Sequence, residues 1–135
     1  MKSLKLVLKK KYWDLIASGE KTEEYREVKP YWLHKLLAVP EWDINDRITG
    51  YFTVGNSMDD KCTAEFLKES LRNGELTAMP YGYVTCYLGY AKNRPSMTFK
   101  IKSVSIDEGR AEWGAESKKQ YFVIKFQNNI KKNYV

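Results

Sequence analysis

The first part of the chain shows a strand-like and then a helix-like pattern of apolar residues. Apolar and polar residues alternate across Leu4–Leu8, which predicts a first β-strand. Over Lys11–Ser18 the apolar residues return at helical spacing, with Trp13 and Ile16 on one side, so this segment is predicted to be a short helix. Gly19 follows directly and is well placed to end that helix in a left-handed conformation.

Two later segments also have a helical pattern. One begins at Lys29-Pro30, where proline occupies an early position that a helix tolerates. The other covers Cys62–Leu71 and is followed by the turn-forming pair Asn73-Gly74. Their apolar positions are Leu33, Leu36 and Leu37 in the first helix, and Phe66 and Leu67 in the second. Each helix is therefore predicted to bury one apolar stripe.

The remaining apolar runs are typical of strands. They are 46–54, Tyr83–Leu88, Met97–Ile106 and Tyr121–Phe126, with a loop over 109–119 before the last. The alternation changes phase by one residue between Ile101 and Val104, which indicates a β-bulge. Because strands outnumber helices in one small chain, we expect an α+β fold whose sheet closes into a small β-barrel, with short helices packed at its ends.

Length and composition agree with one small domain over residues 1–135. The chain is 43% hydrophobic and 14% aromatic, which is enough to form one core. Its formal net charge is +6, and a basic balance favours polyanionic partners, nucleic acid first. The alternative is a lysine-rich protein with solvated ends, since part of the excess charge falls at 9–11 and 131–132.

The sequence offers little support for a membrane, export or metal-binding role. No apolar run approaches the roughly 20 residues that span a bilayer, and lysines at 9–11 interrupt any signal-peptide core. Cys62 and Cys86 are far apart, and His34 is the only histidine, so a structural zinc site lacks ligands. We therefore expect a cytoplasmic protein with reduced thiols and with neither a metal nor another cofactor.

The run Gly19-Glu20-Lys21-Thr22-Glu23-Glu24-Tyr25-Arg26 is the most informative part of the chain. If it is extended, each of its two faces carries both cations and carboxylates, so neither is an ordinary apolar strand face. One interpretation is a solvated edge strand, in which an exposed ion pair at Lys21 contributes at most about 1 kcal/mol. The other is a site for a polar, partly anionic ligand such as a nucleotide.

The spacing Gly19-x-Lys21-x-x-Glu24-x-Arg26 resembles the G-x-K-x-x-E-x-R signature of the ASCH family. Segments 89–95 and 112–115 and the strand Tyr121–Phe126 are similar to later blocks of small ASCH proteins. The resemblance implies a PUA-like β-barrel, related to domains that bind RNA. It also implies that the signature lines the ligand cleft, with Gly19, Thr22, Tyr25 and Arg26 among the ligand-binding residues.

Several further residues are candidates for this ligand site. Lys21 and Arg26 are suited to phosphate or an oxyanion, and Lys92 and Arg94 extend a positive rim unless they form a solvated hairpin tip. The aromatic candidates for base stacking are Tyr25, Tyr90 and Trp113, whose alternative role is packing.

Glu24 and Glu112 are candidates for a carboxylate pair, or for an acid–base couple of one of them with Lys21. A structural ion pair is the alternative. Some ASCH proteins resemble an acetylcytidine amidohydrolase, whose site uses the signature lysine, a threonine three residues later and a downstream glutamate. Lys21 matches that lysine and Glu112 stands for the glutamate, but Glu24 occupies the threonine position. Other family members act as ribonucleases on single-stranded RNA.

Two hypotheses from different classes follow. The first is a domain that binds RNA or a modified nucleoside in a cleft lined by Lys21, Glu24 and Arg26. The second is a small hydrolase acting on the same class of ligand, by cleaving single-stranded RNA or an acetylcytidine-type amide. The binding hypothesis leads because it requires less of the site, and an interaction domain without a nucleic-acid role is a third alternative.

Overall fold

The computed structural model describes the backbone of residues 3–38 and 60–133. Its helices are α1 (Lys10–Ala17), α2 (Pro30–Leu36), α4 (Asp60–Arg72) and the 3₁₀ turn η1 (Ala111–Trp113). Its strands are β1 (Ser3–Leu8), β2 (Glu23–Glu27), β3 (Leu37–Ala38), β4 (Thr77–Ala78), β5 (Tyr83–Leu88), β6 (Ser96–Glu108) and β7 (Gln120–Asn133). The predicted α+β class is confirmed, whereas the strand predicted at 46–54 lies outside the described residues.

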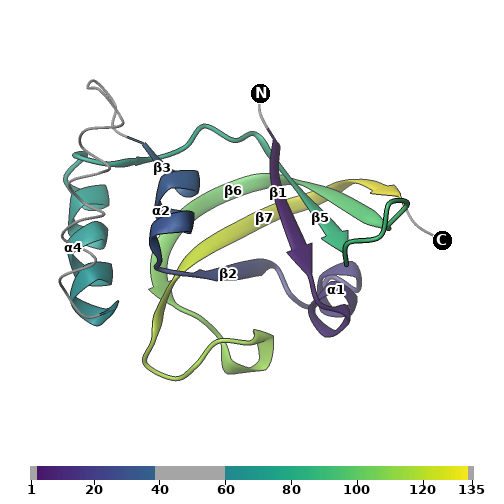
Figure 1. The fold of residues 1–135 in the computed structure, drawn as a ribbon, viewed down its shortest axis with the longest axis horizontal. Helices are drawn as coiled ribbons and strands as arrows, with labels where there is room; N and C mark the ends of the chain where they lie inside the picture. The colour runs from purple at the N-terminus through teal and green to yellow at the C-terminus, as the bar shows by residue number, and fades with distance from the viewer. Residues whose placement is uncertain (1–2, 39–59, 134–135) are drawn as a thin grey trace.

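A five-stranded sheet with the order β1-β5-β6-β7-β2 forms the body of the molecule (Figure 1). β1 runs parallel to β5, and the other neighbours in this sheet are antiparallel. The long strands β6 and β7 form its spine, with α1 at one end and α2 and α4 at the other. A register shift between Ile101 and Ser103 is the irregularity that the change of phase predicted.

The sheet is not a closed barrel within the described residues. β1 and β2 are its two edges, and no backbone ladder joins them in this part of the chain. A side chain of β2 nevertheless spans the opening, because Arg26 Nη2 donates a hydrogen bond of 3.1 Å to the carbonyl oxygen of Val7 in β1. The curvature of the sheet thus brings its edge strands within reach of each other without pairing them.

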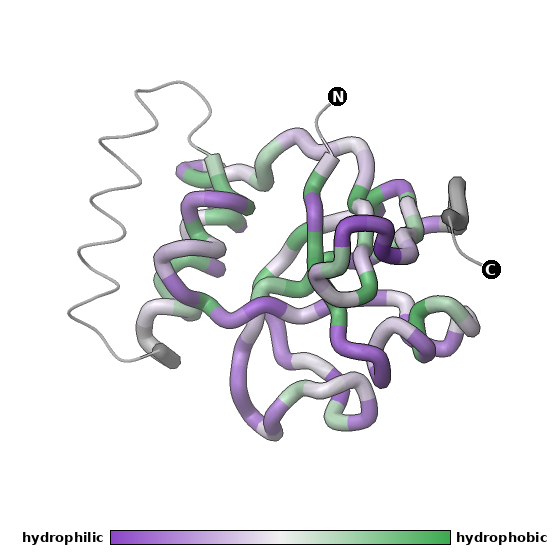
Figure 2. The backbone as a smooth tube through the Cα atoms, turned by 45° about the vertical axis from the view of Figure 1, so that its right-hand side comes forward, coloured by the Kyte–Doolittle hydropathy of each residue, from purple (hydrophilic) through white to green (hydrophobic). Residues whose placement is uncertain are grey.

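The predicted core positions are largely confirmed. Trp13 and Ile16 of α1 are buried, as are Leu33, Leu36 and Leu37. Hydrophobic stretches are concentrated in the central strands, whereas the peripheral loops are largely hydrophilic (Figure 2). No helix in the described ranges has the length and apolar character needed to cross a membrane.

The predicted centre of α4 is wrong at one position. Leu67 is fully buried, but Phe66 is 40% exposed. Within residues 63–72 of this helix, the buried side chains are Thr63, Ala64, Leu67 and Ser70. Their spacing of three and four residues defines one helical face, and position 66 lies outside it. Small and hydroxyl side chains therefore complete the stripe that two large apolar residues were expected to form.

Burial of Cys86 has a measurable consequence at high pH. Burial raises the pKa of this thiol from 9.0 to about 12. Above pH 9 the unfolded chain releases this proton while the folded chain keeps it, so the Cys86 contribution to stability falls as pH rises. We expect urea denaturation at pH 7 and pH 10 to show a loss on the order of 1 kcal/mol from this thiol. The Cys86→Ala variant should lack that part of the loss, and identical pH dependences in the two proteins would contradict the prediction.

Candidate functional site

Backbone contacts after α1 direct the signature lysine inward. Gly19 ends the helix with φ of 85°, the left-handed conformation that the sequence predicted. The next turn folds back on α1, because the Lys21 N–H donates to the carbonyl oxygen of Leu15 at 3.0 Å. The chain then enters β2 and pairs with β7, which places Glu24 opposite Ile124 in the sheet. The turn and the ladder together fix Lys21 and Glu24 on adjacent parts of the backbone.

Lys21 is the centre of a buried polar cluster. Its side chain is 0% exposed, and Nζ donates to Glu24 Oε1 at 2.8 Å and to the Trp113 carbonyl oxygen at 3.0 Å. The ring of Tyr12 lies over Nζ at 4.2 Å from its centroid, a cation–π contact. Two hydrogen bonds and the contact with the Tyr12 ring therefore surround the buried ammonium. The interpretation of this run as a solvated edge is therefore wrong for Lys21 and Glu24.

Glu24 links this lysine to the arginine of the signature. Oε1 also accepts from the Tyr25 backbone N–H at 3.0 Å, and Oε2 lies 3.4 Å from Arg26 Nη2. The Arg26 guanidinium is 5.1 Å from the centroid of the Trp32 ring and bonds to β1 as described above. A single carboxylate thus lies between two cations, and the three signature side chains form one continuous chain of charge.

A pocket of about 620 Å³ opens beside this cluster, and we call it the aromatic pocket. It is lined by the aromatic residues Tyr12, Tyr25, Tyr90, Trp113 and Tyr121, the charged residues Lys9, Lys10, Glu24 and Arg26, and Val7, Leu8, Leu88, Gly89 and Gly114. Glu24 and Arg26 belong to this lining, but Lys21 does not. Its volume falls within the range of about 300–1,000 Å³ that is usual for small-ligand sites.

Tyr25 is a fixed, neutral wall of the aromatic pocket. Its hydroxyl donates to Glu23 Oε2 at 2.8 Å and accepts from the Arg110 backbone N–H at 2.9 Å. Burial raises the pKa of the Tyr25 phenol well above its usual value, and the Glu23 carboxylate adds to the shift. The ring is therefore held by both of its hydroxyl contacts and carries no charge at neutral pH.

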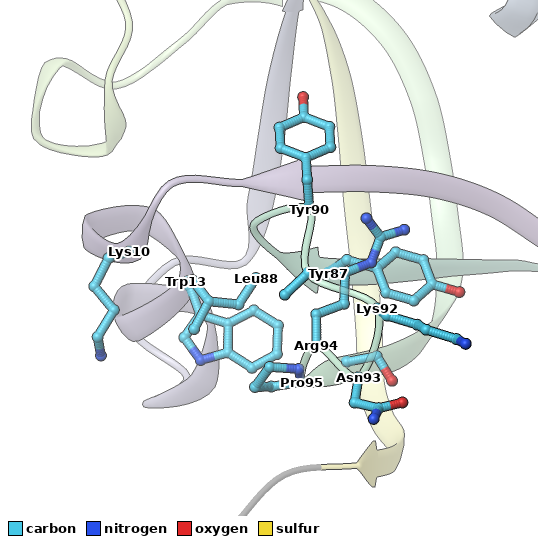
Figure 3. Close-up of a pocket in the computed structure, with 11 residues that line it drawn as sticks. Lys10, Trp13, Tyr87, Leu88, Tyr90, Lys92, Asn93, Arg94 and Pro95 are labelled. Atoms are coloured by element: carbon cyan, nitrogen blue, oxygen red, sulfur yellow. The ribbon is translucent and has the colours of Figure 1, made fainter.

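A second pocket of about 1040 Å³ lies beside the β5–β6 turn, and we call it the basic pocket (Figure 3). Its charged residues are Lys10, Lys92 and Arg94, and its aromatic residues are Trp13, Tyr87 and Tyr90. Lys10, Leu88 and Tyr90 line both pockets. The two hollows are therefore neighbours that share a wall, and Tyr90, 83% exposed, projects from that wall.

The structure brings together only part of the predicted site. Lys21, Glu24, Tyr25, Arg26 and Trp113 meet at the aromatic pocket or directly behind it. Lys92 and Arg94 line the basic pocket instead. Gly19 lines neither pocket, and its role is the turn described above.

Thr22 and Glu112 lie away from the Lys21–Glu24 pair. Thr22 is exposed, and its carbonyl oxygen accepts from the Phe126 N–H at 3.0 Å. Glu112 is also exposed, and its carboxylate lies 3.6 Å from Arg110 rather than near Lys21. The physical reason is that η1 turns the next residue inward, so the backbone oxygen of Trp113 meets the lysine where a carboxylate was expected.

Residues missing from the sequence-based site include Tyr12, Tyr121 and Lys10. Tyr12 covers Lys21 from α1, and Tyr121 enters the pocket from the start of β7. The position of Tyr12 next to Trp13 in the predicted helix gives no sign of the lysine beneath its ring. Tyr121 is the first residue of the strand predicted over Tyr121–Phe126, and nothing in that apolar run marks it as a pocket residue. No local motif distinguishes these tyrosines from packing residues.

Neither metal-ligand geometry nor comparison with known proteins assigns a function to the site. The described residues contain no group of three or more histidine, cysteine, aspartate or glutamate side chains arranged to hold a metal ion. No protein-family model matches the chain, and no match was found among curated proteins or solved structures.

Proposed function

We propose that this protein binds RNA or a modified nucleoside and holds one base in the aromatic pocket. The observation that carries the proposal is a pocket with five aromatic residues in its lining and both Glu24 and Arg26 among its polar groups. Aromatic faces stack on any base, while a carboxylate and a guanidinium offer an acceptor and donors to its polar edge. Lys9 and Lys10 add positive charge suited to the attached phosphate.

We propose the ASCH family and its PUA-like fold as the class of the protein. The signature residues Lys21, Glu24 and Arg26 contact one another in one cluster beside a pocket. A motif that matched the signature only by chance would have no reason to form such a cluster. The curved sheet with its bridged edges supports a barrel-related fold. Cytoplasmic RNA or nucleosides are the ligands that this class would meet.

A hydrolase acting on the same ligands is the second candidate. It is favoured by one observation, the 2.8 Å contact between Lys21 and Glu24 at the pocket wall, since such a couple can transfer protons. It ranks below binding because Lys21 already bonds to Glu24 and to the Trp113 carbonyl oxygen, and the Tyr12 ring covers it. Reaction at this lysine would require the Tyr12 ring to move.

The proposal is tested by titrating a labelled, mixed-sequence single-stranded RNA at low and moderate salt. We expect binding that weakens steeply with salt, because phosphate contacts release counterions. Tyr90→Ala should weaken it by roughly tenfold, the value of one stacked base, and should leave the melting temperature unchanged because the side chain is 83% exposed.

Tyr31→Ala is the matched control for Tyr90→Ala. Tyr31 is also exposed, at 64%, and lines neither pocket, so its loss should leave RNA affinity unchanged. Equal effects of the two substitutions would argue against stacking in the aromatic pocket. No binding of RNA or of the four nucleosides at low salt would overturn the proposal itself.

A further inference from the structure

The basic pocket carries charge that binding of a single base leaves unused. Its lining contains three cations, Lys10, Lys92 and Arg94, and no carboxylate. Figure 3 shows Lys10 on α1 and Lys92 on the β5–β6 turn at opposite sides of the hollow, with Arg94 between them. A lining of this kind favours an anion over a neutral or cationic group.

Arg94 is held in place before any ligand arrives. Nη1 donates to the carbonyl oxygen of Gly89 at 3.1 Å, and the guanidinium carbon lies 4.1 Å from the centroid of the Tyr87 ring. The turn that carries it is closed by a hydrogen bond of 3.1 Å from the Leu88 N–H to the Pro95 carbonyl oxygen. A guanidinium has five N–H donors, so most remain for an anion after the bond to Gly89. Such a fixed, stacked fork is well suited to phosphate.

The two lysines can add to this arginine at little cost. Lys92 is exposed on the turn. Lys10 pairs with Asp14 at 2.6 Å, but both side chains are more than half exposed, and an exposed pair of this kind is readily exchanged for another anion. Asp14 does not line the basic pocket. The anion site can therefore recruit both side chains without disturbing the core.

We propose that the basic pocket binds the phosphate next to the base held in the aromatic pocket, so that the ligand is a strand of at least two nucleotides rather than a free nucleoside. This inference rests on the proposed function. Tyr90 and Lys10 line both pockets, so a strand that passes Tyr90 leaves one hollow and enters the other. Tyr90 then stacks a base at the crossing point, while Arg94 meets the phosphate beyond it.

The test is a competition experiment against the labelled RNA. The competitors are the four nucleosides, their 3′- and 5′-monophosphates and the corresponding dinucleotides with a terminal phosphate. For the wild-type protein we expect the best phosphorylated competitor to be about tenfold or more stronger than its nucleoside, the value of a hydrogen bond to a charged group. Arg94→Gln and Lys92→Gln should each reduce that gain and leave the nucleoside unaffected.

Matched controls come from exposed cations that line neither pocket. Arg72→Gln on α4 and Lys102→Gln on β6 remove the same charges elsewhere and should preserve the gain from phosphate. If Arg94→Gln disturbs the turn, Lys92→Gln still tests the loss of a positive charge from the basic pocket. The strand proposal would be overturned if the wild-type protein bound the phosphorylated competitors no better than the nucleosides. It would also be overturned if Arg94→Gln and Lys92→Gln both kept the full wild-type preference for phosphate, and in either case nucleoside binding would stand. Failure of every competitor and of the RNA itself would instead remove the proposed function.

Discussion

Replacing Lys21 with methionine is expected to lower the free energy of unfolding by about 3 kcal/mol. The Lys21 side chain is 0% exposed and neutralises Glu24, whose own side chain is only 8% exposed. Removing one partner of a buried ion pair costs about 3–5 kcal/mol, because the other charge stays buried. We take the lower end since Glu24 keeps its contacts with Arg26 and the Tyr25 N–H. Thermal and urea denaturation measure the loss, which corresponds to roughly 10 °C in melting temperature.

A second substitution, at Glu24, separates the effect of the buried charge from the effect of lost side-chain packing. Lys21→Met combined with Glu24→Gln removes both charges and should recover part of the stability lost in Lys21→Met, giving a positive coupling in a double-mutant cycle. Lys102→Met, on an exposed lysine, serves as the control and should change stability by less than about 0.5 kcal/mol. A Lys21→Met protein as stable as this control would show that the lysine is not a structural ion-pair partner.

Gly114→Ala is expected to destabilise the protein by about 3 kcal/mol and to weaken RNA binding. Gly114 has φ of 103°, which strains any residue with a Cβ by about 1–3 kcal/mol. An added Cβ would also lie 2.7 Å from Cζ and from the hydroxyl oxygen of Tyr12. The ring of Tyr12 must then move away from Lys21 and from the lining of the aromatic pocket. Denaturation and RNA titration measure the two effects.

Gly19→Ala isolates the backbone part of this effect. Gly19 has φ of 85°, but no heavy atom lies within 4 Å of an added Cβ, so only strain of about 1–2 kcal/mol is expected. Equal losses of stability in Gly114→Ala and Gly19→Ala would mean that the Tyr12 ring moves aside with no loss of stability. In that case Lys21 would be readily uncovered, and the hydrolase candidate would gain support over binding.

Periodicity predicted the elements well where a single local rule decides the structure. The helix around Trp13 and Ile16 is confirmed, with observed bounds of Lys10–Ala17, and the strand Tyr83–Leu88 matches to the residue. The same reasoning failed at Phe66, because hydrophobicity alone does not show which helical face meets the sheet. The predicted closure of the sheet into a barrel is not seen in the described residues, because closure depends on the curvature and register of strands far apart in sequence.

The site was predicted only as far as local spacing reaches. The interval from Lys21 to Arg26 places three side chains within a few residues, and all three are in one cluster. The partners that decide their accessibility come from elsewhere, namely Tyr12 on α1 and the backbone oxygen of Trp113. The predicted Glu112 carboxylate is not the group that meets Lys21, and a sequence does not show that the Trp113 backbone oxygen will do so. The small stability cost predicted for losing Lys21 applies to an exposed ion pair. Because the pair is buried, a larger cost is expected.

The edge positions of β1 and β2 determine when the sheet can assemble on the ribosome. Ser3 pairs with Tyr83, and Glu23 pairs with Lys125. Both N-terminal strands are therefore synthesised long before the strands with which they pair. Closing such long loops is entropically costly and slows folding relative to local hairpins. The β5–β6–β7 meander is the part that can form first, and β1 and β2 then dock on its two sides. A nascent chain halted before β7 lacks the partner of β2, so its β2 segment should remain sensitive to protease.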